Sequence, residues 1–445
     1  NLATLGAILL FGMTVTELRH TPAPPTGTPG EYEIVVRERL SEREGKTASG
    51  TTIRARRNSA TGEWLPAAGN LVVRCDSSTA LNPGDRAVVR GKIYPFTARH
   101  GGYGRLMTRR GYVGTLYLNR SSLLLSDTLH RELSPKHLSL FLHERAVARL
   151  DRLALAPDEQ ALCNAMTAGD RRSLSPALRA AYSRSGTSHL LAVSGLHVGI
   201  VFLLANLLLW WLPLFRHGHI LRNIAVILLI WLYAATTGFP PSVVRAALMF
   251  SVLQFALASS SEYVGMNTLA GVAFVMLLFH PDYLFDISFQ LSFIAVAGII
   301  AWGLPLCRLL RTRRKSIDML TATLAIGFSA SAATAPLISH TFGQISVVGL
   351  ALNPVVILLS YVVVGSCTLW LVIPGTALAP LFSVVAGFAA RAQNELIRAA
   401  AALPAAALDI RLTTTQCWSV YGLFIFATLL LWSAERKKSV SSLPE

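Results

Sequence analysis

The pattern of apolar and polar residues divides the chain into three regions. Residues 1–16 are apolar, residues 17–187 are largely polar, and residues 188–433 contain nine long apolar runs. A helix needs about 17–25 mainly apolar residues to cross a bilayer. The pattern predicts a polytopic α-helical membrane protein. Residues 1–16 are then the rest of a truncated transmembrane helix, and residues 434–445 are a basic cytoplasmic tail.

Nine membrane spans are predicted after residue 188. They are 189–212, 222–238, 240–258, 263–280, 285–305, 318–338, 346–372, 376–400 and 416–433. The 376–400 run is amphipathic, which fits either a helix lining a cavity or one lying at the membrane interface. Basic loops remain in the cytoplasm. The cations at 216–222, 308–315 and 436–438 all follow odd-numbered spans. The region before residue 188 is therefore predicted to lie outside.

Residues 31–130 show the alternation typical of strands, after a linker at 17–30 rich in Pro, Gly and Thr. Five segments carry it: 31–39, 51–57, 71–76, 86–94 and 111–119. Five short strands in so few residues predict a small β-barrel. Strand number alone fits an OB-type and an SH3-like barrel equally well.

Residues 138–187 have a helical period. Leu142, Ala146, Leu150 and Leu153 share one face of the first helix, with charged residues opposite. The pattern predicts amphipathic helices along the membrane surface, or packed against the barrel as an alternative.

Composition agrees with a membrane protein and adds a charge signal. The mean hydropathy is +0.48, and charged residues are only 14% of the chain, with a net charge of +16. Residues 17–150 hold 21 Lys and Arg against 12 Asp and Glu. Such an excess suits a polyanion such as nucleic acid or lipid headgroups, or solubility and topology alone. Five scattered cysteines form no CxxC pair, so no metal site is predicted.

The predicted barrel interleaves cations with aromatic rings. Cations pair with phosphates and rings stack on unpaired bases, the combination that single-strand binders use. The candidate DNA-binding residues are Arg54, Arg56, Arg57, Lys92, Tyr94, Phe96, Arg99, Arg105, Arg109 and Arg110. Tyr94 and Phe96 are explained equally well as core residues of the barrel.

Polar residues gather at the start of the first predicted span. His189, Ser194, Gly195 and His197 lie within nine residues, and a continuous helix would place them on one polar face. Buried polar groups in a membrane need partners or a wet cavity. This stretch therefore predicts a helix facing the protein interior.

Other polar residues occur deeper in the apolar runs, namely Arg245, Asp286, Gln290 and Asn353. Arg245 follows Pro240-Pro241 and is predicted either to contact a phosphate or to pair with Asp286. Asn353-Pro354 interrupts a long apolar run, as a broken helix beside a permeation path or as a simple kink.

The stretch Gly186-Thr187-Ser188-His189-Leu190-Leu191-Ala192-Val193-Ser194-Gly195-Leu196-His197 resembles the signature of the ComEC family, the inner-membrane DNA channel of natural competence. Three later stretches resemble the family in the same order: 238–246, 281–293 and 349–354. The resemblance implies an exported OB-like domain at 31–130 and a competence-type transmembrane domain at 188–433. Many members continue into a metallo-β-lactamase domain, which this sequence does not include.

We therefore predict a channel for single-stranded DNA in the cytoplasmic membrane, with no enzymatic activity, cofactor or metal. The membrane potential opposes each entering charge by about 2.3 kcal/mol per 100 mV. The sequence has no nucleotide-binding motif, so the energy that offsets this cost must come from another source. The predicted partners are single-stranded DNA, the lipid bilayer, a cytoplasmic helicase or translocase motor and a periplasmic DNA-binding receptor. A homo-oligomer is left open. The alternatives are a membrane-embedded hydrolase, using Ser194 with His189 or His197, and a secondary transporter of a small anion.

Overall fold

The computed structural model describes most of the chain in two units. The described residues are 27–43, 46–58, 61–76, 81, 84–96, 104, 107–108, 111–127, 135–259, 265–346, 348–373, 378–403 and 407–441. One unit comprises residues 1–144 with 276–285, and the other comprises 145–275 with 286–445. The predicted span at 1–16 and most of the linker lie outside the described residues.

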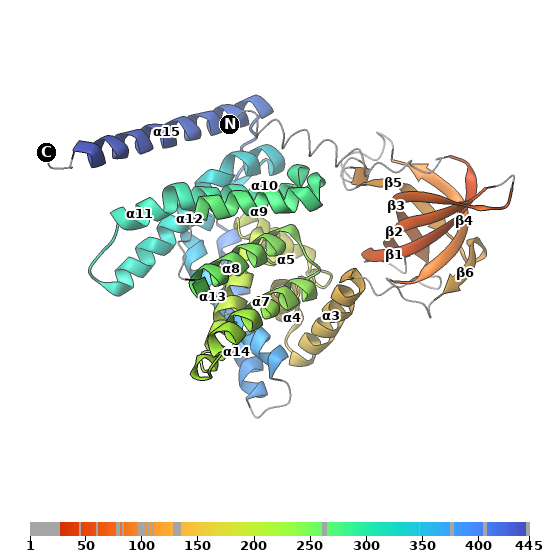
Figure 1. The fold of residues 1–445 in the computed structure, drawn as a ribbon, viewed down its shortest axis with the longest axis horizontal. Coiled ribbons are helices and arrows are strands. Elements are labelled where there is room, and N and C mark those ends of the chain that lie inside the picture. Colours follow the sequence, from red (N-terminus) through yellow and green to blue (C-terminus); the bar gives the residue numbers. More distant parts are fainter. Residues whose placement is uncertain are drawn as a thin grey trace. The chain divides into compact units, whose positions relative to one another are not determined.

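The first unit contains a β-barrel (Figure 1). Its strands are β1 (Pro29–Arg43), β2 (Lys46–Arg57), β3 (Trp64–Asp76), β4 (Arg86–Pro95), β5 (Tyr112–Leu118) and β6 (Leu123–Asp127). Neighbours pair in the order β1-β2-β3-β5-β4, and β4 pairs again with β1. That last pairing closes five strands into a barrel, while β6 adds to the edge of β4. The predicted small barrel is confirmed.

Every second side chain of each strand points inward and fills the barrel interior. Tyr32, Ile34 and Val36 of β1 point inward, as do Ile93 of β4 and Leu116 of β5. All five are at most 1% exposed. Successive side chains on a strand point to opposite faces, so the residues between them face outward. This parity makes the outer face of β4 readable from the sequence.

The second unit is helical. The helices are α3 (Pro135–Leu150), α4 (Pro157–Thr167), α5 (Pro176–Arg184), α6 (Gly195–Leu208), α7 (Gly218–Thr236), α8 (Pro241–Ser259), α9 (Gly265–Phe279), α10 (Ile287–Gly298), α11 (Leu304–Leu309), α12 (Lys315–Phe342), α13 (Val348–Val372), α14 (Ala379–Ala401) and α15 (Thr414–Ser441). Two of these helices, α3 and α9, also extend into the first unit. A short turn η5 (Ser188–Leu191) precedes α6, and a π-helical turn at Ile299–Gly303 joins α10 to α11. The short strands β7 (Ile345–Ser346) and β8 (Ala407–Leu408) pair with each other.

Five helical segments in the described part are long and apolar enough to cross a membrane. They are Gly195–Leu214, Gly218–Thr236, Ile287–Leu309, Ile317–Phe342 and Ala351–Val372. The apolar helices at Pro241–Ala256 and Gly265–Phe279 are shorter. The described part thus contains several helices compatible with the predicted membrane spans, and the number nine stays a prediction.

Two apolar cores hold the helical unit together. One joins α6, α7 and α8 through residues such as Val198, Ile230 and Val243. The other joins the end of α3 with α4, α5, α13 and α14. Leu150 and Leu153, on the predicted apolar face, lie in this second core. The end of α3 and the residues that follow it, up to Tyr182, therefore pack within the helical unit.

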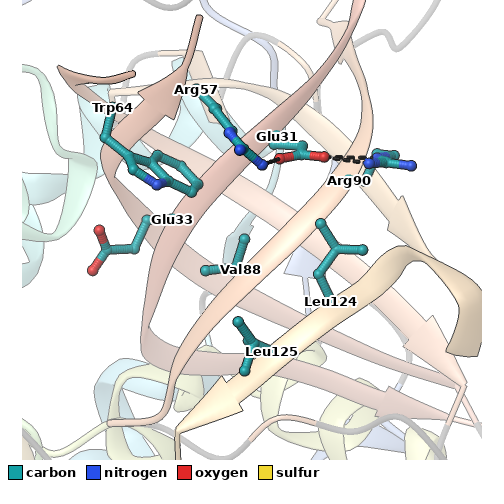
Figure 2. A pocket seen from close by; sticks show the side chains of 8 residues that line it. All are labelled: Glu31, Glu33, Arg57, Trp64, Val88, Arg90, Leu124 and Leu125. Carbon is teal, nitrogen blue, oxygen red and sulfur yellow. Dashed lines mark hydrogen bonds and ion pairs between the residues drawn. The ribbon is translucent and has the colours of Figure 1, made fainter. Parts of the chain in front are cut away.

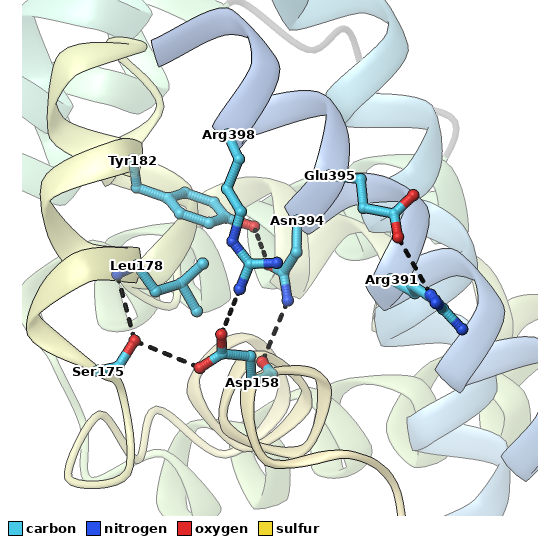
Figure 3. A network of polar contacts seen from close by, with 8 residues as sticks. All are labelled: Asp158, Ser175, Leu178, Tyr182, Arg391, Asn394, Glu395 and Arg398. Atoms are coloured by element: carbon cyan, nitrogen blue, oxygen red, sulfur yellow. Dashed lines mark hydrogen bonds and ion pairs between the residues drawn. The ribbon is translucent and has the colours of Figure 1, made fainter. Parts of the chain in front are cut away.

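The amphipathic helix α14 uses its polar side for packing. Buried Asn394 accepts a hydrogen bond from the Tyr182 hydroxyl at 3.1 Å and donates to the backbone oxygen of Asp158 at 3.2 Å (Figure 3). Arg398 forms an ion pair with the Asp158 carboxylate. Burial raises the pKa of the Tyr182 phenol, which therefore stays protonated as a donor. These contacts bind α14 to α4 and α5.

Candidate functional site

A cation and two aromatic rings line the outer face of β4 and β5. The Lys92 ammonium lies 5.6 Å from the centroid of the Tyr94 ring. The Tyr94 and Tyr117 rings meet edge to face with centroids 5.9 Å apart. The two tyrosines are 47% and 57% exposed. Tyr94 is therefore not a core residue of the barrel, because its strand parity turns it outward.

Tyr117 was not among the predicted DNA-binding residues. Its strand partner on β3 is Arg74, which is also exposed. The alternation Thr115-Leu116-Tyr117-Leu118 marked Tyr117 as an outward position, and this was the signal that could have found it. We call Arg74, Lys92, Tyr94 and Tyr117 the barrel stripe.

A second outer surface of the barrel is a groove whose arginines already have partners. Glu31 accepts hydrogen bonds from Arg57, at 3.1 Å, and from Arg90 (Figure 2). These bonds lower the pKa of the Glu31 carboxyl, and the bond from Arg90 has a larger effect than the bond from Arg57. The groove has a volume of about 540 Å³ and is also lined by Trp64, Leu124 and Leu125. A phosphate at Arg57 would have to compete with Glu31.

The other predicted DNA-binding residues are placed differently. Arg54 is exposed on β2, whereas Arg56 is half-buried and its Nε has no hydrogen-bond partner. Phe96 is half-buried against a small apolar cluster. Arg99, Arg105, Arg109 and Arg110 lie outside the described residues. Their proposed role stays a prediction.

The polar stretch before α6 is not one continuous helix, which corrects the prediction. His189 lies in the turn η5, and α6 begins only at Gly195. Ala192 and Ser194 have extended backbones, which separate the two segments. His189 is exposed, whereas His197 is fully buried. The prediction that one continuous helix places both histidines on a single polar face is therefore wrong.

His197 has a defined tautomer. Its Nδ1 accepts a hydrogen bond from the backbone N–H of Ser194 at 3.0 Å. A neutral imidazole whose Nδ1 accepts carries its proton on Nε2. This Nε2 is buried and has no partner. His197 thus binds the N–H of Ser194, the residue before α6, and presents a donor to the interior.

The hydrolase alternative finds no matching geometry. In the described part of the chain, no hydrogen bond joins the Ser194 hydroxyl to His189 or His197. A nucleophilic serine needs an adjacent base within hydrogen-bond reach. The contact that does form uses the Ser194 backbone, which has no nucleophilic role.

Ser194→Ala is expected to leave transformation frequency and thermal stability essentially unchanged, because its side chain makes no hydrogen bond. Ser242→Ala is a matched control. The Ser242 hydroxyl donates to the Val193 backbone oxygen at 2.9 Å, so its loss is expected to cost about 1 kcal/mol. Transformation assays and thermal denaturation in detergent measure both. Abolished transformation by well-folded Ser194→Ala protein would favour the hydrolase.

Arg245 lies at the first turn of α8 and is only 6% exposed. Its guanidinium stacks over the Phe293 ring of α10, 5.7 Å from the centroid. Its Nε has no hydrogen-bond partner, and no ion pair involving Arg245 occurs among the described residues. The predicted pair with Asp286 is wrong. The Asp286 carboxylate instead caps α10, accepting from the N–H groups of Ser288 at 2.7 Å and Phe289 at 3.2 Å.

Two further polar residues of the predicted spans are Gln290 and Asn353. Gln290 is half-buried on α10. Asn353 lies near the start of α13, and its Oδ1 is buried without a partner. Helix α13 continues through Pro354, so the broken-helix alternative is wrong there. Pro354 lies inside the helix, where it removes the backbone hydrogen bond to residue 350, so the kink alternative fits this position.

The order of these elements can now be compared with known proteins. A family model described as Competence protein matches residues 166–437, more than half of the chain. The chain belongs to the ComEC family of competence proteins. Residues 166–437 run from the end of α4 into α15, so the match takes in His197, Arg245 and helix α14.

Two relatives of this ComEC-family chain illustrate how much is shared. ComE operon protein 3 of Bacillus subtilis (strain 168) is 33% identical over 204 residues, which are 45% of this chain and 24% of that protein. An uncharacterized protein of Aquifex aeolicus (strain VF5) is 29% identical over 201 residues, 45% of both chains. The chain therefore matches less than half the length of each relative. No solved structure matches it.

Proposed function

We propose that this protein is the membrane channel through which single-stranded DNA enters the cell during natural transformation. Membership of the ComEC family supports a role in DNA uptake. The observation that carries the proposal is Arg245, a buried cation in the helical unit without an anionic partner in the described part. Ionisable groups at membrane depth usually face a pathway or a ligand, and a passing phosphate backbone supplies the missing charge.

The barrel is proposed to be an OB-type domain that gathers the strand. Its closed order β1-β2-β3-β5-β4 with a parallel β3–β5 pair supports this type over an SH3-like barrel. The barrel stripe combines cations with exposed rings, as sequence-tolerant single-strand binders do. Within the described residues, no carboxylate pairs with the stripe as Glu31 pairs with Arg57.

The proposed setting is the cytoplasmic membrane, with the barrel on the outer side. The basic loops after α6 and α11 support this orientation. A cytoplasmic helicase or translocase is proposed to pull the strand, and an external DNA-binding receptor to deliver it. A polymer lacks the single bound state that ion-coupled transport uses, which favours a motor over a proton gradient.

DNA binding by the barrel stripe tests the proposal. The full chain, in nanodiscs of zwitterionic lipid, is expected to bind a labelled oligothymidylate with an affinity that falls steeply with salt. Replacing Tyr94 and Tyr117 together by alanine is expected to raise the Kd about tenfold or more, since each stacked base contributes about 1–3 kcal/mol. Fluorescence anisotropy measures the binding.

Trp64→Ala is the matched control, because Trp64 is a similarly exposed ring on the same barrel but lines the Glu31 groove. It is expected to bind DNA as the unchanged protein does. Equal loss in both variants would move the site away from the barrel stripe. Negligible binding by the unchanged protein at low salt would contradict the proposed role of the barrel.

A further inference from the structure

The start of α6 and the first turn of α8 lie together at one end of the helical unit. The Ser242 hydroxyl ties the start of α8 to Val193, just before α6. Gly195 faces Arg245 and Ala246, and Gly199 faces Phe250 one turn further along. The two helices therefore run in the same direction, and their N-termini are neighbours.

Among the described residues, no side chain is hydrogen-bonded to the N–H groups of Gly195 and Leu196 at the start of α6, whereas the His197 N–H is bound by the Ser194 backbone oxygen at 3.1 Å. Ser194 accepts no capping hydrogen bond, although its own N–H is bound by His197. The first N–H groups of a helix have no partner within the helix and carry part of its positive dipole. The neighbouring helix α10 differs, because Asp286 caps it. An anion is thus already supplied at α10 and missing at α6.

Arg245 points at this uncapped end. A Cβ atom placed on Gly195 would lie 2.9 Å from Arg245 Nη2, so the guanidinium touches the first residue of α6. The Phe293 ring supports one face of the guanidinium. The edge of the guanidinium, which carries its donors, is left for another group. A buried unpaired charge is strongly destabilising, so a structural role does not explain Arg245.

We propose that Arg245 and the N-terminus of α6 form a binding site for one phosphodiester group of the transported strand. The inference rests on the proposed function and adds the contact that it lacks. A phosphodiester offers two non-bridging oxygens that share one negative charge, and these match the forked donors of an arginine and the N–H groups of Gly195 and Leu196 at the helix end. Gly195 has no side chain, so the backbone and the guanidinium reach the same oxygen atoms.

Two measurements on variants test the site. Arg245→Gln is expected to lower transformation about tenfold or more, since a hydrogen bond to a charged group contributes about 1.5–3 kcal/mol. The same variant, purified without DNA, is expected to melt at a higher temperature, because an unpaired buried charge is gone. Gly195→Ala keeps the charge but displaces the guanidinium, and is expected to lower transformation without raising the melting temperature.

Arg222→Gln is the matched control. Arg222 is a half-buried arginine of α7 that already bonds to the Asn206 side chain at 3.0 Å. Its replacement is expected to lower the melting temperature and leave transformation per folded molecule unchanged. If Arg245→Gln behaves like Arg222→Gln, Arg245 is a structural cation and the inference is overturned. A strain with the unchanged protein that transforms no better than a deletion strain would instead contradict the proposed function.

Ligand-induced stabilisation identifies the anion. The melting temperature is measured in maltoside detergent and phosphate-free buffer. The protein used carries Tyr94→Ala and Tyr117→Ala, so that the barrel stripe does not contribute to DNA binding. Oligothymidylate is expected to raise the melting temperature of this protein, whereas its uncharged methylphosphonate analogue is expected to leave the melting temperature unchanged. Adding Arg245→Gln is expected to abolish the rise. Stabilisation by inorganic phosphate or by phosphatidylglycerol, without stabilisation by oligothymidylate, would assign the site to a small anion or a lipid headgroup and overturn the inference.

Discussion

Gly218→Ala is expected to prevent the turn between α6 and α7 from forming. A Cβ on Gly218 would lie 1.7 Å from the backbone oxygen of Leu212 and 2.5 Å from its carbonyl carbon. The neighbour is backbone, so no side chain can swing away, and the turn itself must move. We expect a loss of about 3 kcal/mol or more, the upper range for overpacking a well-packed site. The yield of monodisperse protein after detergent extraction measures it.

Gly365→Ala is the control for this prediction. Gly365 is a buried glycine within α13, and no atom lies within 4 Å of the position its Cβ would take. Alanine has a higher helix propensity than glycine, by about 1 kcal/mol. Gly365→Ala should therefore extract as well as the unchanged protein. Normal yield and melting temperature for Gly218→Ala would show that the close approach to Leu212 is not obligatory.

Asn394→Leu is expected to be the most damaging single change on α14. The side chains have the same branched shape, but leucine leaves the Tyr182 hydroxyl without its acceptor and removes the hydrogen bond to the Asp158 carbonyl, which keeps its partner within α4. An unsatisfied buried donor costs about 1–3 kcal/mol, which is the expected loss. Thermal denaturation of the purified protein in detergent is the measurement, and reduced docking of α14 should also increase proteolysis of this helix.

The adjacent residue supplies the control. Glu395 pairs with Arg391 at 3.1 Å on the same helix, but both side chains are more than 60% exposed (Figure 3). An exposed pair of this spacing contributes about 0.3–0.5 kcal/mol. Glu395→Gln should therefore barely change the melting temperature. A similar loss in both variants would mean that α14 is held by its charge and not by its buried contacts.

The sequence by itself determined the barrel and the membrane character of the chain. Alternation over residues 86–94 predicted a strand, because strand parity is a local property of successive residues, but it left open whether Tyr94 lies in the core. The length of an apolar run likewise predicts a membrane span without any information on which helices pack beside it. The stretch 186–197 indicated the family through its resemblance to the ComEC signature. None of these inferences required a contact between distant residues.

Only the tertiary structure decided which partners the polar residues have. Asp286 and Arg245 suggested an ion pair by charge, yet Asp286 caps its own helix and Arg245 lies between Gly195 and Phe293. The amphipathic face of α14 fitted a cavity or an interface, and it packs through Asn394 on α4 and α5. Local period shows that a polar face exists. What covers that face depends on helix packing between residues more than 40 positions apart in the sequence, which no local pattern records.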